Sequence, residues 1–239
     1  MGKSISLIMP AYNEEDTLEF SVRSLTESLR RHGFDYEIFI FDDASRDRTG
    51  LIANILRDED RNIKVFHNLK NMNLGHNFSE GIGMATKTYV GLVPCHGLIN
   101  PKSYDSILAA CASCEKDVVI CYVANPTIRP ISRQLISKVN VAIINWLFGL
   151  NLRYYHLNFY RTELLKQVPT STRSYAVMVE SLVYLIKSDA SFVEIPFVLR
   201  PRLYGKSKAL RLKNVINILK TYVRLFWQIM ILRKRIDLN

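Results

Sequence analysis

Cysteine is scarce in this chain of 239 residues: four cysteines occur, at positions 95, 111, 114 and 121, and only one CxxC pair is present. A zinc ribbon needs a second such pair, and an intracellular chain of this size does not need disulfides. Cys111 and Cys114 fall in a helical pattern, so we interpret them as two small helix residues, with a metal or redox role as the alternative. Repeats and low-complexity linkers are also lacking, and with 48% hydrophobic residues one globular domain is expected.

Acidic residues are nearly missing from the C-terminal segment. Residues 1–199 contain 21 basic and 21 acidic side chains, whereas residues 200–239 contain 11 basic ones and a single acid, Asp237. The whole net charge of +10 therefore lies in the last forty residues. A nucleic-acid-binding domain would more often spread its basic residues over the folded body, so we expect no nucleic-acid partner. A neutral body with a basic tail is the favoured interpretation.

A secretory signal is not visible either, because Met1-Gly2-Lys3-Ser4 leads straight into a short strand-like run with polar residues close behind. We expect the body to face the cytoplasm. Short apolar runs and helical patterns alternate at βαβ spacing through the first half, which predicts a mainly parallel sheet with helices on both faces, an α/β fold. The expected strands are 4–9, 36–41, 63–67, 89–93 and 118–123, and the expected helices are 16–32, 49–57, 78–86 and 104–114.

The second half predicts helices over 132–148 and 176–187 and an edge strand over 192–199, interrupted by Pro196. A last helical pattern over 212–232 is rich in large apolar residues, but Lys213, Lys220, Arg224 and Gln228 interrupt it. A membrane span of about 20 mostly uncharged residues is therefore not expected. With aromatic residues and a basic end, this amphipathic helix fits the surface of an anionic membrane, the alternative being a packed helix with a solvated end. We divide the chain at 208, into a body of 1–208 and a basic amphipathic segment of 209–239.

Ligands of a parallel sheet bind at the carboxyl ends of its strands, so the loops there are the candidate site. The first strand is followed by Pro10-Ala11-Tyr12-Asn13-Glu14-Glu15. A tyrosine ring that can stack on a base, beside a carboxylate that accepts hydrogen bonds, suits a nucleoside. Taken alone, the segment is also typical of a helix start with Asn13 as its cap.

The second strand is followed by Asp42-Asp43-Ala44-Ser45-Arg46-Asp47-Arg48-Thr49. Two carboxylates at the end of an apolar strand are costly unless something binds or caps them, which makes a ligand plausible. Asp47 or Ser45 is equally suited to cap the next helix. The two motifs together, about thirty residues apart, are far more specific than either alone.

With these two motifs the sequence resembles the family 2 glycosyltransferases of the GT-A fold, and most of all the branch of dolichol-phosphate mannosyltransferase and bacterial polyprenyl-phosphate glycosyltransferases. The resemblance implies a Rossmann-like sheet and a nucleotide-sugar donor, UDP- or GDP-linked. It also implies which residues bind the base and ribose: Pro10, Tyr12, Glu14, Phe41 and Asp43, with Asp42 as a further candidate.

The resemblance extends through most of the chain. Arg133 and Ser137 match a segment that meets the lipid phosphate in the polyprenyl-phosphate branch, and Glu180 sits where the family carries an acid near the sugar and acceptor. The loop after the edge strand resembles the family's RxxGxSK loop. Its cationic and hydroxyl groups suit a diphosphate or a lipid phosphate, although the run alone would be a solvated basic loop. Arg202 and Glu180 are the expected catalytic residues, and Lys206, Ser207 and Lys208 are expected to bind phosphate.

The clearest departure concerns the metal. The family places an Asp-x-Asp that holds a divalent cation after the fourth strand, where this chain has Cys95-His96-Gly97. Mg²⁺ prefers carboxylate oxygen, so a typical Mg²⁺ or Mn²⁺ site is doubtful here. His96 is a candidate ligand of Mn²⁺ or a softer metal, or a donor directly to the donor's phosphate. Two further departures, over 153–161 and at Cys121-Tyr122-Val123, alter residues near the expected sugar and phosphate sites.

The resemblance implies an inverting transferase that moves a sugar onto a polyprenyl phosphate while peripherally bound to the cytoplasmic face of the membrane. A lipid phosphate is ionised near neutral pH and needs no strong base, so alignment and stabilisation of the leaving diphosphate suffice. If the acceptor were a glycan hydroxyl, Glu180 would be the natural base. A non-catalytic protein that binds nucleotide sugars is the remaining alternative, because of the altered metal motif.

Overall fold

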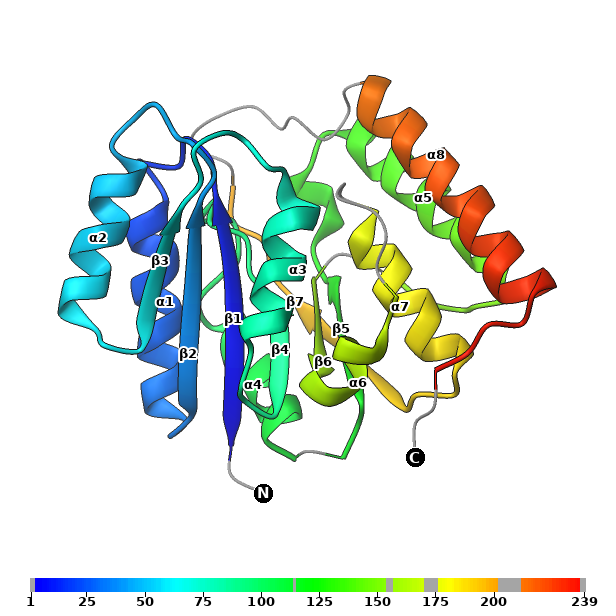
Figure 1. Cartoon of the computed structure of the whole chain (residues 1–239), viewed down its shortest axis with the longest axis horizontal. Coiled ribbons are helices and arrows are strands. Elements are labelled where there is room, and N and C mark those ends of the chain that lie inside the picture. The colour runs from blue at the N-terminus through cyan, green and yellow to red at the C-terminus, as the bar shows by residue number, and fades with distance from the viewer. Residues whose placement is uncertain (1–2, 114, 154–156, 170–175, 202–211, 237–239) are drawn as a thin grey trace.

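The computed structural model describes residues 3–113, 115–153, 157–169, 176–201 and 212–236. Its core is a seven-stranded sheet in the order β3-β2-β1-β4-β6-β5-β7 (Figure 1). The strands are β1 (Ser4–Ala11), β2 (Asp35–Asp42), β3 (Ile63–His67), β4 (Tyr89–Leu92), β5 (Val118–Val123), β6 (Leu157–Arg161) and β7 (Phe192–Phe197). Every neighbouring pair is parallel except the two pairs that β6 makes, with β4 and with β5. The predicted α/β fold with a mainly parallel sheet is confirmed.

Two layers of helices cover the sheet. One apolar cluster joins the sheet to α1 (Leu18–Arg31), α2 (Thr49–Glu59) and α4 (Ser103–Ser113). The other joins it to α3 (Leu74–Met84), α6 (Thr162–Gln167), α7 (Val177–Lys187), α5 (Ile131–Phe148) and α8 (Leu212–Phe226). Alternation along β1 explains the division, because Ile5, Leu7 and Met9 pack in the first cluster and Ile8 in the second.

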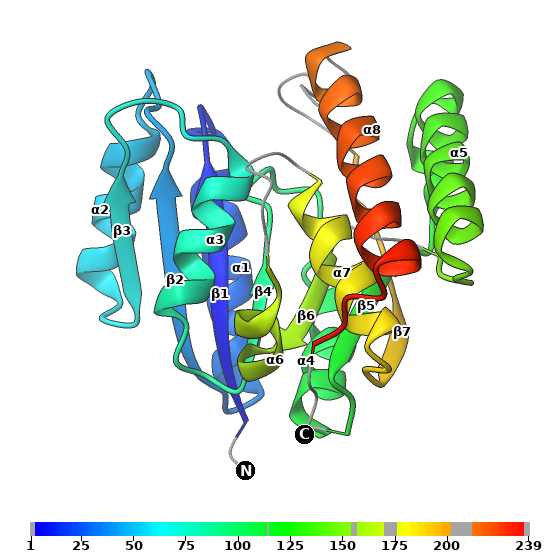
Figure 2. The same ribbon diagram turned by 45° about the vertical axis from the view of Figure 1, so that its right-hand side comes forward.

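The α5 and α8 helices form an outer layer beside α7 (Figure 2). The Tyr222 hydroxyl of α8 donates a hydrogen bond to Asn140 Oδ1 of α5 at 2.8 Å, and burial raises the pKa of Tyr222 to about 12. Leu225 and Ile229 of the C-terminal segment are fully buried on the body. The described part of the predicted 212–232 helix thus packs on the domain, and its last turn, Trp227–Ile231, is π-helical.

Several boundaries differ from the sequence prediction. α3 begins at Leu74 rather than at residue 78, and β7 ends at Phe197, with Pro196 at the sheet edge as expected. β6 and α6 were not predicted, although β6 lies in the middle of the sheet. Gly91 of β4 faces Phe159 of β6, and a Cβ there would overlap the phenylalanine ring, so the absent side chain makes room for the antiparallel strand.

The carboxylate of Glu37 is buried near the amino end of β2. Glu37 of β2 is 6% exposed and accepts hydrogen bonds from the Ser6 hydroxyl at 2.8 Å and the Thr86 N–H at 2.7 Å, with Lys64 at 3.6 Å. Burial acts to raise the pKa of Glu37, but the donors and Lys64 outweigh it and hold the pKa below its ordinary value of 4.5. The charged form is therefore the one that stabilises the fold.

We predict that Glu37→Gln lowers the free energy of unfolding by about 2 kcal/mol at pH 7, because hydrogen bonds to a charged acceptor are lost. A carboxyl with a lowered folded-state pKa stabilises above its unfolded pKa and loses this stabilisation as pH falls through the folded value. The difference between wild type and variant should hence shrink below about pH 4.5. Urea unfolding at pH 7 and pH 3.5 measures it, with exposed Glu27→Gln as the control. An equal difference at both pH values would contradict the assignment.

Candidate active site

The two polar motifs meet at the carboxyl ends of β1 and β2, where Ala11 pairs with Asp42 in the sheet register. Five hydrogen bonds join the loop after β1 to the loop after β2. They are Asn13 N–H to Ser45 Oγ, Glu14 N–H to Thr49 Oγ1, Glu15 N–H to Asp47 Oδ2, Arg46 N–H to Asn13 Oδ1 and Arg48 N–H to Glu15 Oε2. Segments about thirty residues apart thus form one polar surface at this edge.

Asp47 lies just before α2 and binds the first residue of that helix. Asp47 accepts hydrogen bonds from the Thr49 hydroxyl at 2.6 Å and the Thr49 N–H at 3.0 Å, at the start of α2. Burial acts to raise the pKa of Asp47, but these donors hold it below the ordinary value. Arg48 occupies the N-cap position of α2 and no side chain caps the helix, so the prediction that Asp47 or Ser45 is its N-cap is wrong. Asp47 instead binds the first residue of the helix, and Asn13 and Ser45 hold the two loops together.

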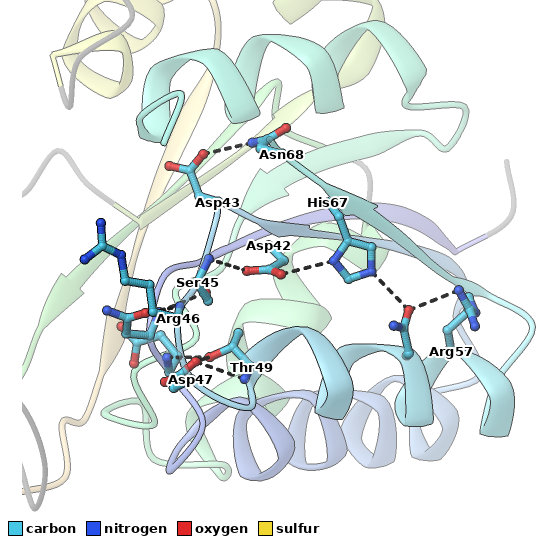
Figure 3. Close-up of polar contacts among 12 residues, drawn as sticks. Asp42, Asp43, Ser45, Arg46, Asp47, Thr49, Arg57, His67 and Asn68 are labelled. Atoms are coloured by element: carbon cyan, nitrogen blue, oxygen red, sulfur yellow. Dashed lines mark hydrogen bonds and ion pairs between the residues drawn. The ribbon is translucent and has the colours of Figure 1, made fainter. Parts of the chain in front are cut away.

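The adjacent carboxylates Asp42 and Asp43 point in different directions (Figure 3). Asp42 accepts the Ser45 N–H at 3.0 Å and lies 3.0 Å from His67 Nδ1. Asp43 accepts three N–H groups, from the Asn68 side chain at 2.8 Å, from Met72 at 2.8 Å and from Asn73 at 3.1 Å. Asp43 thereby ties the end of β2 to the loop before α3.

The expected base and ribose residues are exposed to different degrees. Pro10, Tyr12 and Glu14 are half-buried, whereas Asp42 and Asp43 are 8% and 4% exposed. Phe41 is buried and stacks on Phe66 with ring centroids 5.1 Å apart, so its ring packs in the core beneath the site. The structure brings all six to one edge, and their contact with a nucleotide remains a prediction.

The backbone at this edge is strained at one residue. Ala44 has φ of 62°, in the left-handed region that costs an L residue with a Cβ about 1–2 kcal/mol. Asn13 and Asn73 also have positive φ, which asparagine tolerates better. Strain of this kind concentrates at functional sites.

The loop after β4 approaches the same edge. Ser21 of α1 fixes it by donating to Cys95 O at 2.9 Å and accepting the Gly97 N–H at 3.0 Å. Cys95 is 2% exposed and packs in the core, and burial and nearby Glu14 raise the pKa of its thiol. His96 is half-buried.

The expected acceptor residues lie on other elements. Arg133 and Ser137 are half-buried on α5. Glu180 of α7 is fully buried, and Arg224 of α8 pairs with it at 2.9 Å. Arg202, Lys206, Ser207 and Lys208 lie outside the described residues. Whether these four residues form one site with Arg133, Ser137 and Glu180 therefore stays a prediction.

The sequence analysis missed His67 and Asn68, which contact Asp42 and Asp43. Both lie where β3 ends, at the same edge as the two motifs. The rule about strand ends applied to the third strand would have found them. Next to them is a hollow of about 490 Å³, lined by His67, Asn68, Leu69, Lys70, Met72 and His76.

The model of the family described as Glycosyl transferase family 2 matches residues 6–175, which include the sheet edge and both motifs. The chain is a family 2 glycosyltransferase. The predicted family is thus confirmed, while the branch within it stays a prediction.

Two curated relatives are similar to part of this glycosyltransferase. The uncharacterized glycosyltransferase EpsJ of Bacillus subtilis is 31% identical over 117 residues, 49% of this chain and 33% of its own length. Glycosyltransferase GlyG of Streptococcus pneumoniae is 24% identical over 120 residues, 50% of this chain and 39% of its own. The matches span less than half of either relative.

Solved structures share the fold of this glycosyltransferase over nearly its whole length. Glucosyl-3-phosphoglycerate synthase of Mycobacterium tuberculosis, in complex with phosphoglyceric acid, has a TM-score of 0.68 and 18% identity, covering 95% of this chain and 80% of that one. The same enzyme with Mn²⁺, UDP and glucosyl-3-phosphoglycerate has a TM-score of 0.65 and 17% identity, with the same coverage. At these identities the likeness shows the GT-A fold.

The glycosyltransferase offers a poor donor set for the cation that such neighbours hold. In the loop after β4, Cys95 is buried in the core as a neutral thiol and Gly97 has no side chain. Of the three residues Cys95-His96-Gly97, only His96 therefore offers a candidate metal ligand. Within the described residues no group of three or more His, Cys, Asp or Glu is placed to hold a metal ion. Segments 154–156, 170–175 and 202–211 contain no Asp or Glu. The residues do not fit a hard divalent cation, which prefers carboxylate oxygens.

We predict that Ala44→Gly raises the melting temperature by roughly 2–4 °C, because glycine relieves the strain of positive φ by about 1 kcal/mol after its own entropic cost. Calorimetry of both proteins measures it. Ala53→Gly, in the buried face of α2, is the matched control and should lower the melting temperature. A lower melting temperature for Ala44→Gly would contradict the strain.

Proposed function

We propose that this glycosyltransferase moves a sugar from a nucleotide sugar, UDP- or GDP-linked, to a polyprenyl phosphate at the surface of an anionic membrane. The proposal for the donor rests on the edge formed by β1, β2 and β3, where the acidic pair contacts His67 and Asn68, which line the hollow. Tyr12 lies in the loop after β1 at the same edge. Glucosyl-3-phosphoglycerate synthase, which shares the fold, is solved with UDP and with UDP-glucose, which favours a UDP-linked donor.

The single observation that carries the choice of a lipid acceptor is an exposed apolar stripe on each of two neighbouring helices. On α5 the stripe consists of Ile131, Leu135, Val139, Ile143 and Trp146. The second stripe consists of Leu219 and Val223 of α8 and Trp227 of the π-helical turn directly after it. Ile131 and Trp146 are each 82% exposed and Val223 is 72% exposed. Residues spaced by three or four lie on one side of a helix, so each stripe faces outward as a unit. We call these eight residues the two-helix surface.

The charge around this surface matches an anionic membrane. Residues 124–153 and 212–236 contain ten Lys and Arg and no Asp or Glu. Anionic headgroups attract such segments by about 1 kcal/mol per basic residue near the surface, whereas a second copy of the chain would repel them. No described helix is long and apolar enough to cross a membrane. Insertion of the two stripes into the headgroup region is the arrangement these features favour.

The choice of a phosphate acceptor is supported by the burial of Glu180, the residue expected to act as the base for a hydroxyl acceptor. Glu180 is fully buried and paired with Arg224, a geometry that suits positioning of α8 better than removal of a proton from a sugar hydroxyl. A phosphate oxygen needs no deprotonation. It attacks the anomeric carbon, so that a carbon–oxygen bond to the lipid phosphate forms while the bond to the donor diphosphate breaks. The nucleoside diphosphate leaves, and the configuration at the anomeric carbon of the transferred sugar is inverted.

The test is a transfer assay with radiolabelled UDP-glucose, other UDP-sugars and GDP-mannose, using undecaprenyl phosphate in anionic vesicles as the acceptor. Label should move into the organic-extractable lipid. Parallel reactions contain 3-phosphoglycerate or a lipid-free oligosaccharide. Transfer to either of these instead of the lipid, or no transfer from any donor, would contradict the proposal.

Membrane binding has its own prediction. The double variant Trp146→Asp and Val223→Asp should reduce co-sedimentation with anionic vesicles at least tenfold, because it places two charges in the apolar stripes. Leu51→Asp, at a 54% exposed leucine of α2, is the matched control and should still bind. Equal binding by both variants would show that the two-helix surface does not meet the membrane.

A further inference from the structure

We infer that this glycosyltransferase binds the diphosphate of its donor without a divalent cation, and that Arg200 supplies positive charge in its place. The inference rests on the proposed nucleotide-sugar donor. It follows from the misfit of the loop after β4 to a hard cation and from where the structure places Arg200.

Arg200 is held against that loop by backbone contacts. Its N–H donates to Leu98 O at 2.7 Å, and Asn100 N–H donates to Val198 O at 2.9 Å. Ile99 and Leu199 form an isolated antiparallel bridge between these contacts. The residues after β7 therefore run beside residues 98–100, directly after Cys95-His96-Gly97.

The guanidinium of Arg200 lies over the ring of Phe20, 4.4 Å from the ring centroid. Phe20 also borders Gly97, because a Cβ built on that glycine would be 3.7 Å from the Phe20 ring. One phenylalanine thus contacts both the cation and the loop in which the family carries its aspartates. The neighbouring Thr17 donates to Glu14 Oε2 at 2.9 Å, which links this group to the loop after β1.

The charge of Arg200 is not neutralised within the described part of the chain, where it forms no ion pair with an Asp or Glu. An aromatic face attracts a guanidinium without cancelling its charge or using its N–H donors. Arginine binds phosphate oxygens through two parallel hydrogen bonds and is charged at every working pH. It can therefore compensate a diphosphate where carboxylates cannot hold a metal.

Calorimetric titration of the full chain with UDP and with uridine separates the phosphate contribution from that of the base. For the wild type, the Kd for UDP should agree within twofold in EDTA and in Mn²⁺. Arg200→Ala should weaken UDP binding at least tenfold and uridine binding less than twofold, and Arg200→Lys should fall between. Arg31→Ala, an exposed arginine at the far end of α1, is the matched control and should change neither. Circular dichroism confirms that each variant is folded.

UDP binding by the wild type that requires Mn²⁺ would overturn the inference and leave the proposed donor intact. An equal loss of UDP and uridine binding in Arg200→Ala would overturn the role of Arg200, because such a loss reports a damaged site. If neither UDP nor uridine binds the wild type, and GDP and guanosine also fail, the proposed function fails and the inference with it.

Discussion

The arrangement of the active-site edge depends on the carboxylate of Asp43. It is almost fully buried, and a buried charge is costly unless donors satisfy it. Three N–H groups from residues 68, 72 and 73 do so, while the Asp43 N–H itself donates to Ala11 O at 2.8 Å. One residue therefore connects the ends of β1 and β2 to the loop after β3. Hydrogen bonds to a charged acceptor are stronger than neutral ones, so this edge is organised before any ligand arrives.

The charge distribution of the fold suits two substrates that both carry phosphate, the proposed nucleotide-sugar donor and the proposed lipid-phosphate acceptor. Asp42, Asp43 and Asp47, which follow or end β2, each accept hydrogen bonds from backbone N–H groups. Basic residues of the described chain lie on α5 and on α8, beside the exposed apolar stripes, and Arg200 lies next to the loop after β4. In our account, a neutral body holds the nucleoside, and the basic part meets the diphosphate and the lipid.

The sheet edge was predictable because parallel strands bring their carboxyl ends together, and the two motifs each follow an apolar run. The number of strands was not: β6 is five residues long with a buried asparagine, Asn158, so neither alternation nor an apolar run marks it. The hydrogen-bond and ion-pair partners of the buried acids could not be predicted from the sequence either. Nothing local in the sequence shows that Glu180 meets Arg224 44 residues later, or that Asp43 is satisfied by backbone N–H groups before α3. Such pairs are set by packing, which one-dimensional patterns do not carry.

The most direct test of this account is amide hydrogen exchange at Met72 and Asn73, compared between the wild type and Asp43→Asn. An asparagine at 43 offers one acceptor oxygen instead of two, so at least one of these amides loses its acceptor. The account predicts exchange at least about tenfold faster there, equivalent to about 1.4 kcal/mol, with the Ile38 amide in β2 unchanged. Unchanged exchange at Met72 and Asn73 would contradict the claim that Asp43 organises the donor edge.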